Sequence, residues 1–187
     1  MAVSRPCSVA GATAAYRQLA PAVLGYLRTQ RAPDAENVLG DVFLQVARDF
    51  SRFAGDDAAL RRWVFTIARN RLIDERRRAA RRPLLHDGPL PDRAGTAVPD
   101  ELLDARLLDA LRALTPEQRE VVVLRFVGDL SLEDVARTTR RRRGAVKALQ
   151  HRALATLTRI LADEDDALSG DERPREPTSH RSPAPSG

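Results

Sequence analysis

The chain has 187 residues, enough for one medium-sized domain or two small ones, with 43% hydrophobic but only 4% aromatic residues. This composition, poor in aromatic and β-branched side chains, favours an all-α fold over sheets. The net charge is +5, and residues 163–187 hold seven acidic residues against three arginines, so the first 162 residues carry +9. A basic balance of this kind favours nucleic acid as the partner over acidic small substrates.

Several kinds of protein and site are excluded by what the sequence lacks. Cys7 is the single cysteine, so one chain cannot build a disulfide or a cysteine-based metal site. No apolar run approaches the roughly 20 residues of a membrane helix, and the N-terminus lacks a signal-peptide core. There is no glycine-rich phosphate loop, and the acidic residues and three histidines do not converge. We therefore expect no enzyme, no metal, no cofactor, no small-molecule substrate and no membrane insertion.

Two helices are expected at the start of the chain. Residues 12–30 place apolar side chains at helical spacing, and Pro21 is expected to kink or divide this helix. Residues 34–49 begin with an acidic first turn, which suits the helix dipole, and carry valines and Phe43 on one side. The opposite side of the second helix is polar and carries Glu36, Asn37, Asp41 and Gln45.

A short loop over residues 50–55 leads to a long third helix that ends at about Arg82. Nine arginines lie between Arg61 and Arg82, against Asp74 and Glu75. The apolar face of this helix packs inward, so we expect its arginines to be free to meet phosphates or bases. A solvated amphipathic helix explains any one of these arginines, but not the density of the whole set. Residues 12–82 therefore predict a three- to four-helix bundle with a cationic helix.

Two segments have the composition of linkers. Residues 83–99 are rich in proline and glycine with little periodicity, which predicts a flexible linker between two helical domains. Residues 163–187 are acidic and rich in proline and serine, and lack the apolar side chains that would offset the entropy of ordering. This last segment is expected to be a disordered tail.

Residues 100–162 predict a second helical domain that contains a helix-turn-helix. Thr115 and Gln118 form a capping box, and Ser131 opens a short helix that ends near Thr138. After an interruption at residues 139–142, apolar side chains recur every three or four residues on a basic helix. Such a helix inserts into the major groove of DNA. The exposed residues expected to face base edges and phosphates are Arg142, Arg143, Lys147 and His151.

The turn of this motif carries the arginine run itself. A solvated charged face is the alternative interpretation of the run, but it does not explain the helix caps or the small Ala136 where the two helices must touch. A glycine is expected near Arg140, because an arginine in the left-handed conformation costs about 1 kcal/mol or more. We therefore expect a distorted or differently shaped turn.

The order of these elements resembles the extracytoplasmic-function (ECF) class of bacterial RNA polymerase sigma factors, over about Tyr16 to Leu161. The stretch DAENVLGDVFLQV is similar to the polymerase-binding part of region 2, and WVFTIARNRLIDERRR is similar to the promoter-melting helix. LTPEQREVVVLRFVGDLSLEDVA, followed by GAVKALQHRAL, resembles region 4. The sequence departs from the family pattern at Gly40 and Asp41, where glutamine and glutamate are usual, and at Arg140 and Arg141, where glycine and an apolar residue are usual.

The resemblance implies a role for each group of residues. It implies that the second helix binds the clamp helices of the polymerase β′ subunit through Glu36, Asn37, Asp41 and Gln45. It implies that the non-template strand of the minus-ten element is met by Phe53, Asn70, Asp74 and Arg77. It implies that the minus-thirty-five element is read by Arg142, Arg143, Lys147 and His151.

The function predicted from the resemblance is that of an ECF sigma factor, which binds core RNA polymerase and directs promoter-specific initiation in the cytoplasm. Its implied partners are the β′ clamp helices, the β flap, promoter DNA and an anti-sigma factor. One alternative is a free-standing helix-turn-helix regulator whose N-terminal bundle serves only for dimerisation. Another is an enzyme acting on nucleic acid, for which the sequence offers no catalytic residues.

Overall fold

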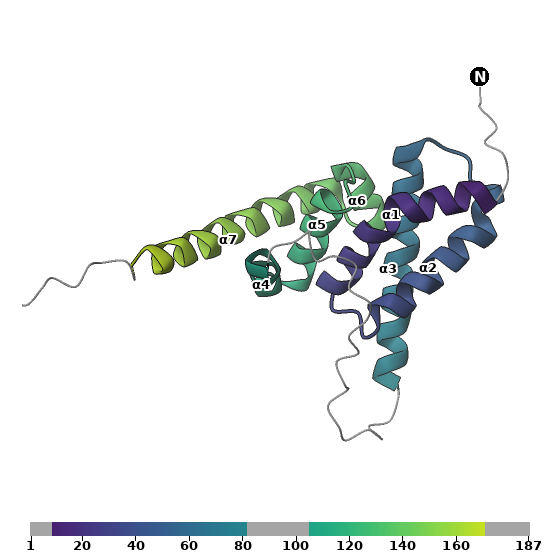
Figure 1. The fold of residues 1–187 in the computed structure, drawn as a ribbon. Coiled ribbons are helices and arrows are strands. Elements are labelled where there is room, and N and C mark those ends of the chain that lie inside the picture. Colours follow the sequence, from purple (N-terminus) through teal and green to yellow (C-terminus); the bar gives the residue numbers. More distant parts are fainter. Residues whose placement is uncertain (1–8, 82–104, 171–187) are drawn as a thin grey trace, which may run out of the picture.

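The computed structural model describes residues 9–81 and 105–170, which form seven α-helices and one short 3-10 helix without any strand in these two ranges (Figure 1). The predicted all-α fold is confirmed. The expected linker over residues 83–99, Cys7 and the tail beyond residue 170 lie outside the described residues.

The N-terminal helices are α1 (Val9–Thr29), α2 (Ala35–Asp49) and α3 (Asp57–Arg81), with a 3-10 helix η1 (Phe50–Arg52) before α3. α1 is one continuous helix across Pro21, so the proline does not divide it. Asp34 caps α2 by accepting a hydrogen bond from the backbone N–H of Asn37 at 3.0 Å. The expected bundle is present, and its fully buried side chains include Val23, Tyr26, Leu27, Val42, Val46, Val64, Phe65 and Leu72.

The C-terminal helices are α4 (Ala105–Ala113), α5 (Pro116–Phe126), α6 (Leu132–Thr139) and α7 (Arg143–Gly170). The capping box of Thr115 and Gln118 opens α5 with both hydrogen bonds in place. α4 was not anticipated from the sequence. α7 also continues past residue 162 to Gly170, since no proline or glycine interrupts residues 163–169. The disorder expected for residues 163–170 is thus replaced by helix.

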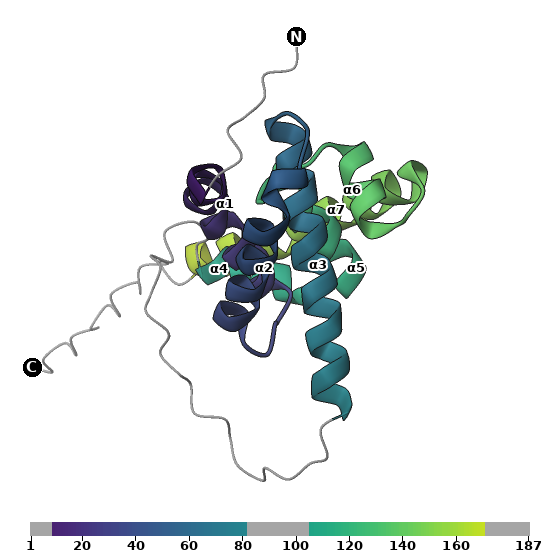
Figure 2. The same ribbon diagram turned by 90° about the vertical axis from the view of Figure 1, so that its right-hand side faces the viewer.

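The two groups of helices lie against each other. α6 packs against α3, and α1 contacts α4 and α5, so the buried residues of both groups form one continuous core. Two views at right angles show α5 and α6 beside α3, with α7 extending away from the rest (Figures 1 and 2). This arrangement decides which side chains of the expected nucleic-acid surface are free.

Candidate nucleic-acid interface

The turn between α6 and α7 of the helix-turn-helix is an ordinary one, with Arg140 as its left-handed residue. The prediction of a distorted turn is therefore wrong. Arg140 has φ 56° and ψ 38°, the left-handed conformation that glycine usually supplies. Its N–H donates to the carbonyl of Arg137, and the N–H of Arg141 donates to that of Ala136 at 2.9 Å. These two bonds are those of a Schellman motif, which satisfies the last carbonyls of α6. Arginine therefore occupies the glycine position and the turn keeps its shape.

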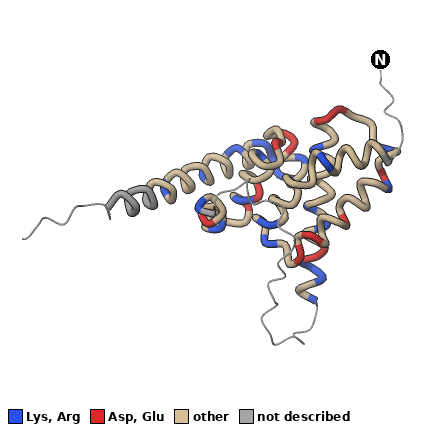
Figure 3. The backbone as a smooth tube through the Cα atoms, in the orientation of Figure 1, with Lys and Arg blue, Asp and Glu red and all other residues tan. Residues whose placement is uncertain are grey.

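The structure brings the four predicted residues of this helix together at the start of α7. Arg143, Lys147 and His151 follow one another at four-residue intervals on the helix, and Arg142 directly precedes it. All four side chains are exposed, and none forms an ion pair with the rest of the described chain. Figure 3 shows the positive residues gathered where α7 begins beside α6. This end of α7 is therefore an unobstructed cationic surface.

A second surface follows one stripe of α3. Asn70, Asp74 and Arg77 are exposed and recur at spacings of four and three, so they share a face of the helix. Arg77 lies 3.8 Å from Asp74. Seven residues before Asn70, the same stripe begins with Trp63, which sequence reasoning did not single out. Its spacing from Asn70 is the signal that would have identified it.

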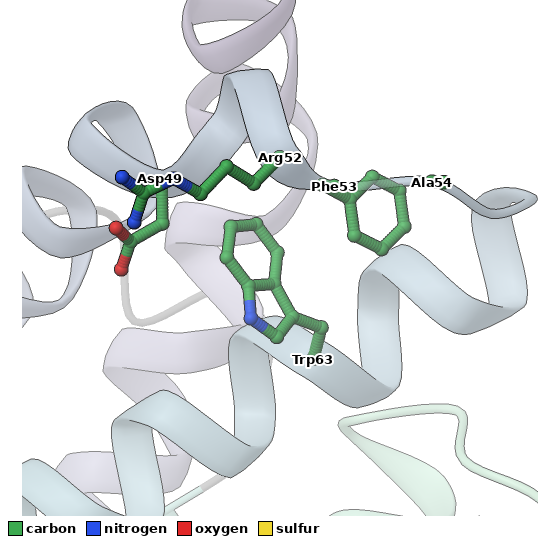
Figure 4. A pocket seen from close by; sticks show the side chains of 5 residues that line it. All are labelled: Asp49, Arg52, Phe53, Ala54 and Trp63. Carbon is green, nitrogen blue, oxygen red and sulfur yellow. The ribbon is translucent and has the colours of Figure 1, made fainter.

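Trp63 and Phe53 form the wall of a small pocket at the head of this stripe. Their rings are stacked, with centroids 5.1 Å apart and planes inclined by 19°. The pocket has a volume of about 290 Å³ and is lined by Asp49, Arg52, Phe53, Ala54 and Trp63 (Figure 4). The predicted residue Phe53 thus reaches the stripe of Asn70 through Trp63. An open pocket with a stacked aromatic wall can receive a planar ring such as a nucleobase.

The predicted polar face of α2 is only partly free. Glu36 accepts a hydrogen bond from Arg28 at 2.8 Å, and that bond lowers the pKa of Glu36 despite some burial. The side-chain oxygen of Gln45 accepts from Nε of Arg71 at 3.1 Å, so this amide is turned toward α3. Asn37 remains exposed and Asp41 half-buried.

Sequence reasoning missed the apolar centre of this face. Leu44 is 57% exposed, and it lies three residues after Asp41 and four after Gly40. A Cβ atom added at Gly40 would meet nothing within 4 Å, so the surface beside Leu44 is open. Leu44 is the apolar residue at the centre of this polar face, which makes it a candidate contact residue, and it could have been found as the apolar residue outside the helix's buried stripe.

Several arginines of α3 are occupied, which corrects the expectation that they are free. Arg62 donates to Asp134 at 2.9 Å, Arg69 donates to Glu120 at 2.9 Å, and Arg61 lies 3.9 Å from Asp129. Arg71 is bound to Gln45, as described above, and Arg76 donates to the carbonyl of Gln30. Arg77 and Arg78 are exposed, and within the described part of the chain their ion pairs are only to α3's own acidic residues. The sequence showed the density of arginines but not their partners.

The features described so far define an all-α protein with a helix-turn-helix and a second, aromatic and basic surface, which is the architecture of a DNA-binding protein. No helix among the described residues is long and apolar enough to cross a membrane, and the same residues contain no metal-binding cluster of histidine, cysteine and acidic side chains.

Comparison with known proteins identifies the family. The profile of Sigma-70 region 2 matches residues 15–82, and that of Sigma-70, region 4 matches residues 104–157. The ECF RNA polymerase sigma factor SigL of Mycobacterium tuberculosis is 34% identical over 143 residues, which cover 72% of this chain and 78% of SigL. The chain belongs to the ECF sigma factors, as predicted, a family that is not a class of enzymes.

Two further relatives show how far the similarity to known proteins extends. The ECF RNA polymerase sigma factor BldN of Streptomyces coelicolor is 34% identical over 145 residues. The match covers 74% of this chain but 55% of BldN, so this chain spans about half the length of that relative. The sigma factor RpoE of Bartonella quintana, crystallised with the anti-sigma factor NepR, shares the fold with a TM-score of 0.60 at 23% identity. That match covers 79% of this chain and 94% of RpoE.

Proposed function

We propose that this chain binds core RNA polymerase and directs it to promoters, acting by binding alone. The observation that carries the proposal is that one small chain has two different surfaces suited to nucleic acid, the basic start of α7 and the aromatic pocket beside the α3 stripe. A free-standing regulator needs only the first of these surfaces. A promoter-specificity subunit needs both, because it must recognise duplex DNA and also hold a melted strand.

The start of α7 is proposed to read the minus-thirty-five element as duplex. Arg142 and Arg143 are long enough to pair bidentately with guanine edges in the major groove, whereas Lys147 is suited to a point contact with phosphate. His151 lies two helical turns beyond Arg143 and marks the far end of the contact. Since Arg140 preserves the turn, α6 holds α7 in the orientation that a helix-turn-helix uses.

The α3 stripe is proposed to hold the non-template strand of the minus-ten element. A base that leaves the duplex loses its stacking, at a cost of a few kcal/mol. Stacking of the base in the pocket of Phe53 and Trp63 offsets part of this cost, since stacking on an aromatic side chain is worth about 1–3 kcal/mol per base. Asn70, Asp74 and Arg77 then line the path of the strand along the same face. Melting is thus driven by binding energy rather than by a chemical step.

The exposed face of α2 is proposed to bind the clamp helices of the β′ subunit. Leu44 supplies an apolar centre, with Asn37, Asp41 and the partly engaged Glu36 and Gln45 around it. The β flap is the second proposed contact. Because RpoE of Bartonella quintana forms a complex with an anti-sigma factor, we propose a partner of that class for this chain too. A polymerase subunit of this kind acts in the cytoplasm, at the nucleoid.

The proposal is tested by mixing the purified chain with core RNA polymerase and measuring comigration in size-exclusion chromatography. The chain is expected to comigrate, and Leu44→Arg is expected to weaken the complex at least tenfold, the loss typical of a central interface residue. Asp109→Arg, at an exposed residue of α4, is the control and should comigrate normally. If the chain does not bind core polymerase and instead binds a palindromic duplex tightly as a dimer, it is a free-standing regulator.

A further inference from the structure

Four arginines from different parts of the fold gather where α1 ends. They are Arg31, Arg76, Arg112 and Arg119. Arg119 of α5 donates to the carbonyl of Thr29, the last residue of α1, at 3.4 Å. Arg76 of α3 donates to the carbonyl of the next residue, Gln30, and Arg31 follows directly in the chain. These four residues are called the arginine cluster.

Arg119 is the buried member of the arginine cluster, with only 6% of its surface exposed. Besides the end of α1, its guanidinium binds the end of α4, where it donates to the carbonyls of Leu111, Arg112 and Leu114 at 2.8, 3.0 and 2.9 Å. These acceptors are carbonyl groups and carry only partial negative charges. Burial, followed by the charges of the other three arginines, lowers the pKa of Arg119. The four guanidinium groups are therefore close enough to repel one another.

The nearest buried carboxylate does not neutralise the cluster, because it has other partners. Glu120 follows Arg119 in the chain, but it accepts from Arg69 at 2.9 Å and from the phenol of Tyr26 at 3.5 Å. Burial, followed by the charge of Glu120, raises the pKa of Tyr26 far above its ordinary value, so the phenol stays a donor. Glu120 is thus already matched by one cation and one neutral donor.

The exposed side of the cluster is also short of negative charge. Asp109 lies 2.6 Å from Arg112, but the two side chains are 65% and 60% exposed, and so exposed a pair contributes little. Arg31 and Arg76 are exposed as well, and neither forms an ion pair within residues 9–81 and 105–170. Three of the four positive charges in the cluster therefore have no carboxylate beside them in the described chain.

Gln30 adds an unpartnered donor to this region. Its side chain is 4% exposed, and Nε2 is buried without a hydrogen-bond acceptor among the described residues. The backbone of the same residue is fixed, since its N–H donates to the carbonyl of Tyr26 at 2.9 Å and its carbonyl accepts from Arg76. A buried N–H without an acceptor destabilises the folded chain, and an oxygen of a bound anion would remove that cost.

Arg31 occupies a position where glycine is usual. It has φ 56°, its N–H donates to the carbonyl of Arg28 at 2.9 Å, and the N–H of Ala32 donates to that of Leu27 at 3.0 Å. These bonds close α1 as the bonds at Arg140 close α6. Glycine would close the helix at lower steric cost, but it would remove an exposed guanidinium from the cluster.

We propose that the arginine cluster binds an oxyanion with two linked phosphate groups, either inorganic pyrophosphate or the diphosphate of a nucleotide. Exposed guanidinium groups bind phosphate oxygens in pairs, and the amide of Gln30 supplies a neutral donor. The buried Arg119 contributes its charge from behind. One phosphate group carries about 1.5–2 negative charges at neutral pH, so two linked groups match three unpaired cations better than one does. The site does not rest on the proposed function, because its residues lie outside the surfaces proposed for DNA and polymerase.

The site is tested by calorimetric titration of the full-length chain with pyrophosphate at constant ionic strength and without Mg²⁺. Pyrophosphate is expected to bind at one site and to raise the midpoint of thermal unfolding, since it binds the folded state. Arg31→Gly removes a guanidinium and relieves the backbone, so it should weaken binding about tenfold while the chain stays folded. Arg140→Gly is the matched control, with the same charge change at the same φ of 56°. Equal affinities in R31G and R140G would overturn the site.

Gln30→Leu separates binding from stability. Leucine fills a similar volume without the unpartnered N–H, so the free chain should be at least as stable as the unsubstituted one. Its affinity for pyrophosphate should nevertheless fall about three- to tenfold, because a donor to the anion is lost. Urea denaturation of the free chain and calorimetry with pyrophosphate measure the two effects. A variant that loses stability but keeps its affinity would show that the amide serves the fold and not a ligand.

Three further probes identify the source of the phosphate groups. Binding of ADP at least as tight as that of pyrophosphate would assign a nucleotide, and tighter binding of pyrophosphate the inorganic ion. Inorganic phosphate should bind at least tenfold more weakly than pyrophosphate, and equal affinities would contradict the proposal. A twelve-nucleotide oligothymidylate that binds through Arg31 when pyrophosphate does not would assign the cluster to nucleic acid instead. A chain that fails to bind core polymerase would contradict the proposed function and leave these results unchanged.

Discussion

The indole of Trp63 is stacked on the ring of Phe53 at 5.1 Å, and this contact connects the loop after η1 to the exposed stripe of α3. The loop contributes one ring of this stacked pair and the helix the other, so the aromatic wall of the pocket depends on α3 beginning where Asp56 and Asp57 place it. The carboxylate of Asp56 accepts from the N–H of Ala59 at 2.8 Å and fixes that start.

The pocket yields the first prediction. Trp63→Ala should reduce open-complex formation by about 10- to 100-fold, because one stacking partner worth about 1–3 kcal/mol is removed. Trp63→Phe keeps an aromatic face and should retain most of the activity. Permanganate reactivity of thymines in the minus-ten element measures the melted fraction. If W63A melts the promoter as well as W63F does, the pocket does not receive a base.

Two residues of α7 should behave differently from each other. Arg143→Ala is expected to cost about 1–3 kcal/mol of binding and to relax preference at one base pair of the minus-thirty-five element. Lys147→Ala should weaken all duplexes about equally and reduce the slope of log affinity against log salt by about one. Titrations of the holoenzyme with duplexes that carry single base changes measure both effects. A uniform loss in R143A would remove this residue from base recognition.

The left-handed Arg140 predicts an unusual stabilising substitution. Arg140→Gly should raise the free energy of unfolding by about 0.5–1 kcal/mol, since glycine adopts φ 56° without the steric cost borne by arginine. Arg140→Ala removes the same charge but keeps the Cβ atom, so it should give no such gain. Urea denaturation of the three proteins makes the comparison, and a loss of stability in R140G would contradict the assignment of strain to this residue.

Asp134 makes stability depend on pH in the acid range. Burial by itself would raise its pKa, but hydrogen bonds from Ser131 and Arg62, with the charges of Arg62 and Arg137, outweigh burial and lower the pKa below its ordinary value. A group whose pKa is lowered on folding stabilises the folded state above its unfolded pKa, and this contribution disappears as the pH falls through the folded value.

The wild-type chain should therefore lose more stability than Asp134→Asn as the pH falls from about 4 downward. Denaturant titrations at a series of pH values measure the difference. Parallel curves for the two proteins would show that the carboxylate is not preferentially stabilised in the folded state.

Local features of the fold could be read from the sequence because they depend on neighbours along the chain. The capping box of Thr115 and Gln118 spans four residues, and the apolar spacing of α2 and α3 follows the period of a helix. The short α4 was missed although Leu107, Leu111 and Leu114 recur at helical spacing, because its nine residues are too few for the apolar period to repeat clearly.

The remaining discrepancies come from contacts between distant residues. Nothing near Arg69 in the sequence indicates that Glu120 will neutralise it, and nothing near Gln45 indicates that its amide will turn toward Arg71. The turn at Arg140 was misjudged for a different reason. Its steric cost follows from the sequence, but the Schellman hydrogen bonds and the burial of Ala136 and Val146 on the two helices hold the conformation regardless.

The most direct test of the proposed function is transcription by reconstituted holoenzyme on fragmented DNA from the source genome, with the transcript start sites determined by sequencing. The account predicts discrete start sites that appear only when the chain is added to core polymerase. These starts should be lost with either Trp63→Ala or Arg143→Ala. The account would be contradicted if core polymerase gave the same starts with and without the chain, or if both variants supported them undiminished.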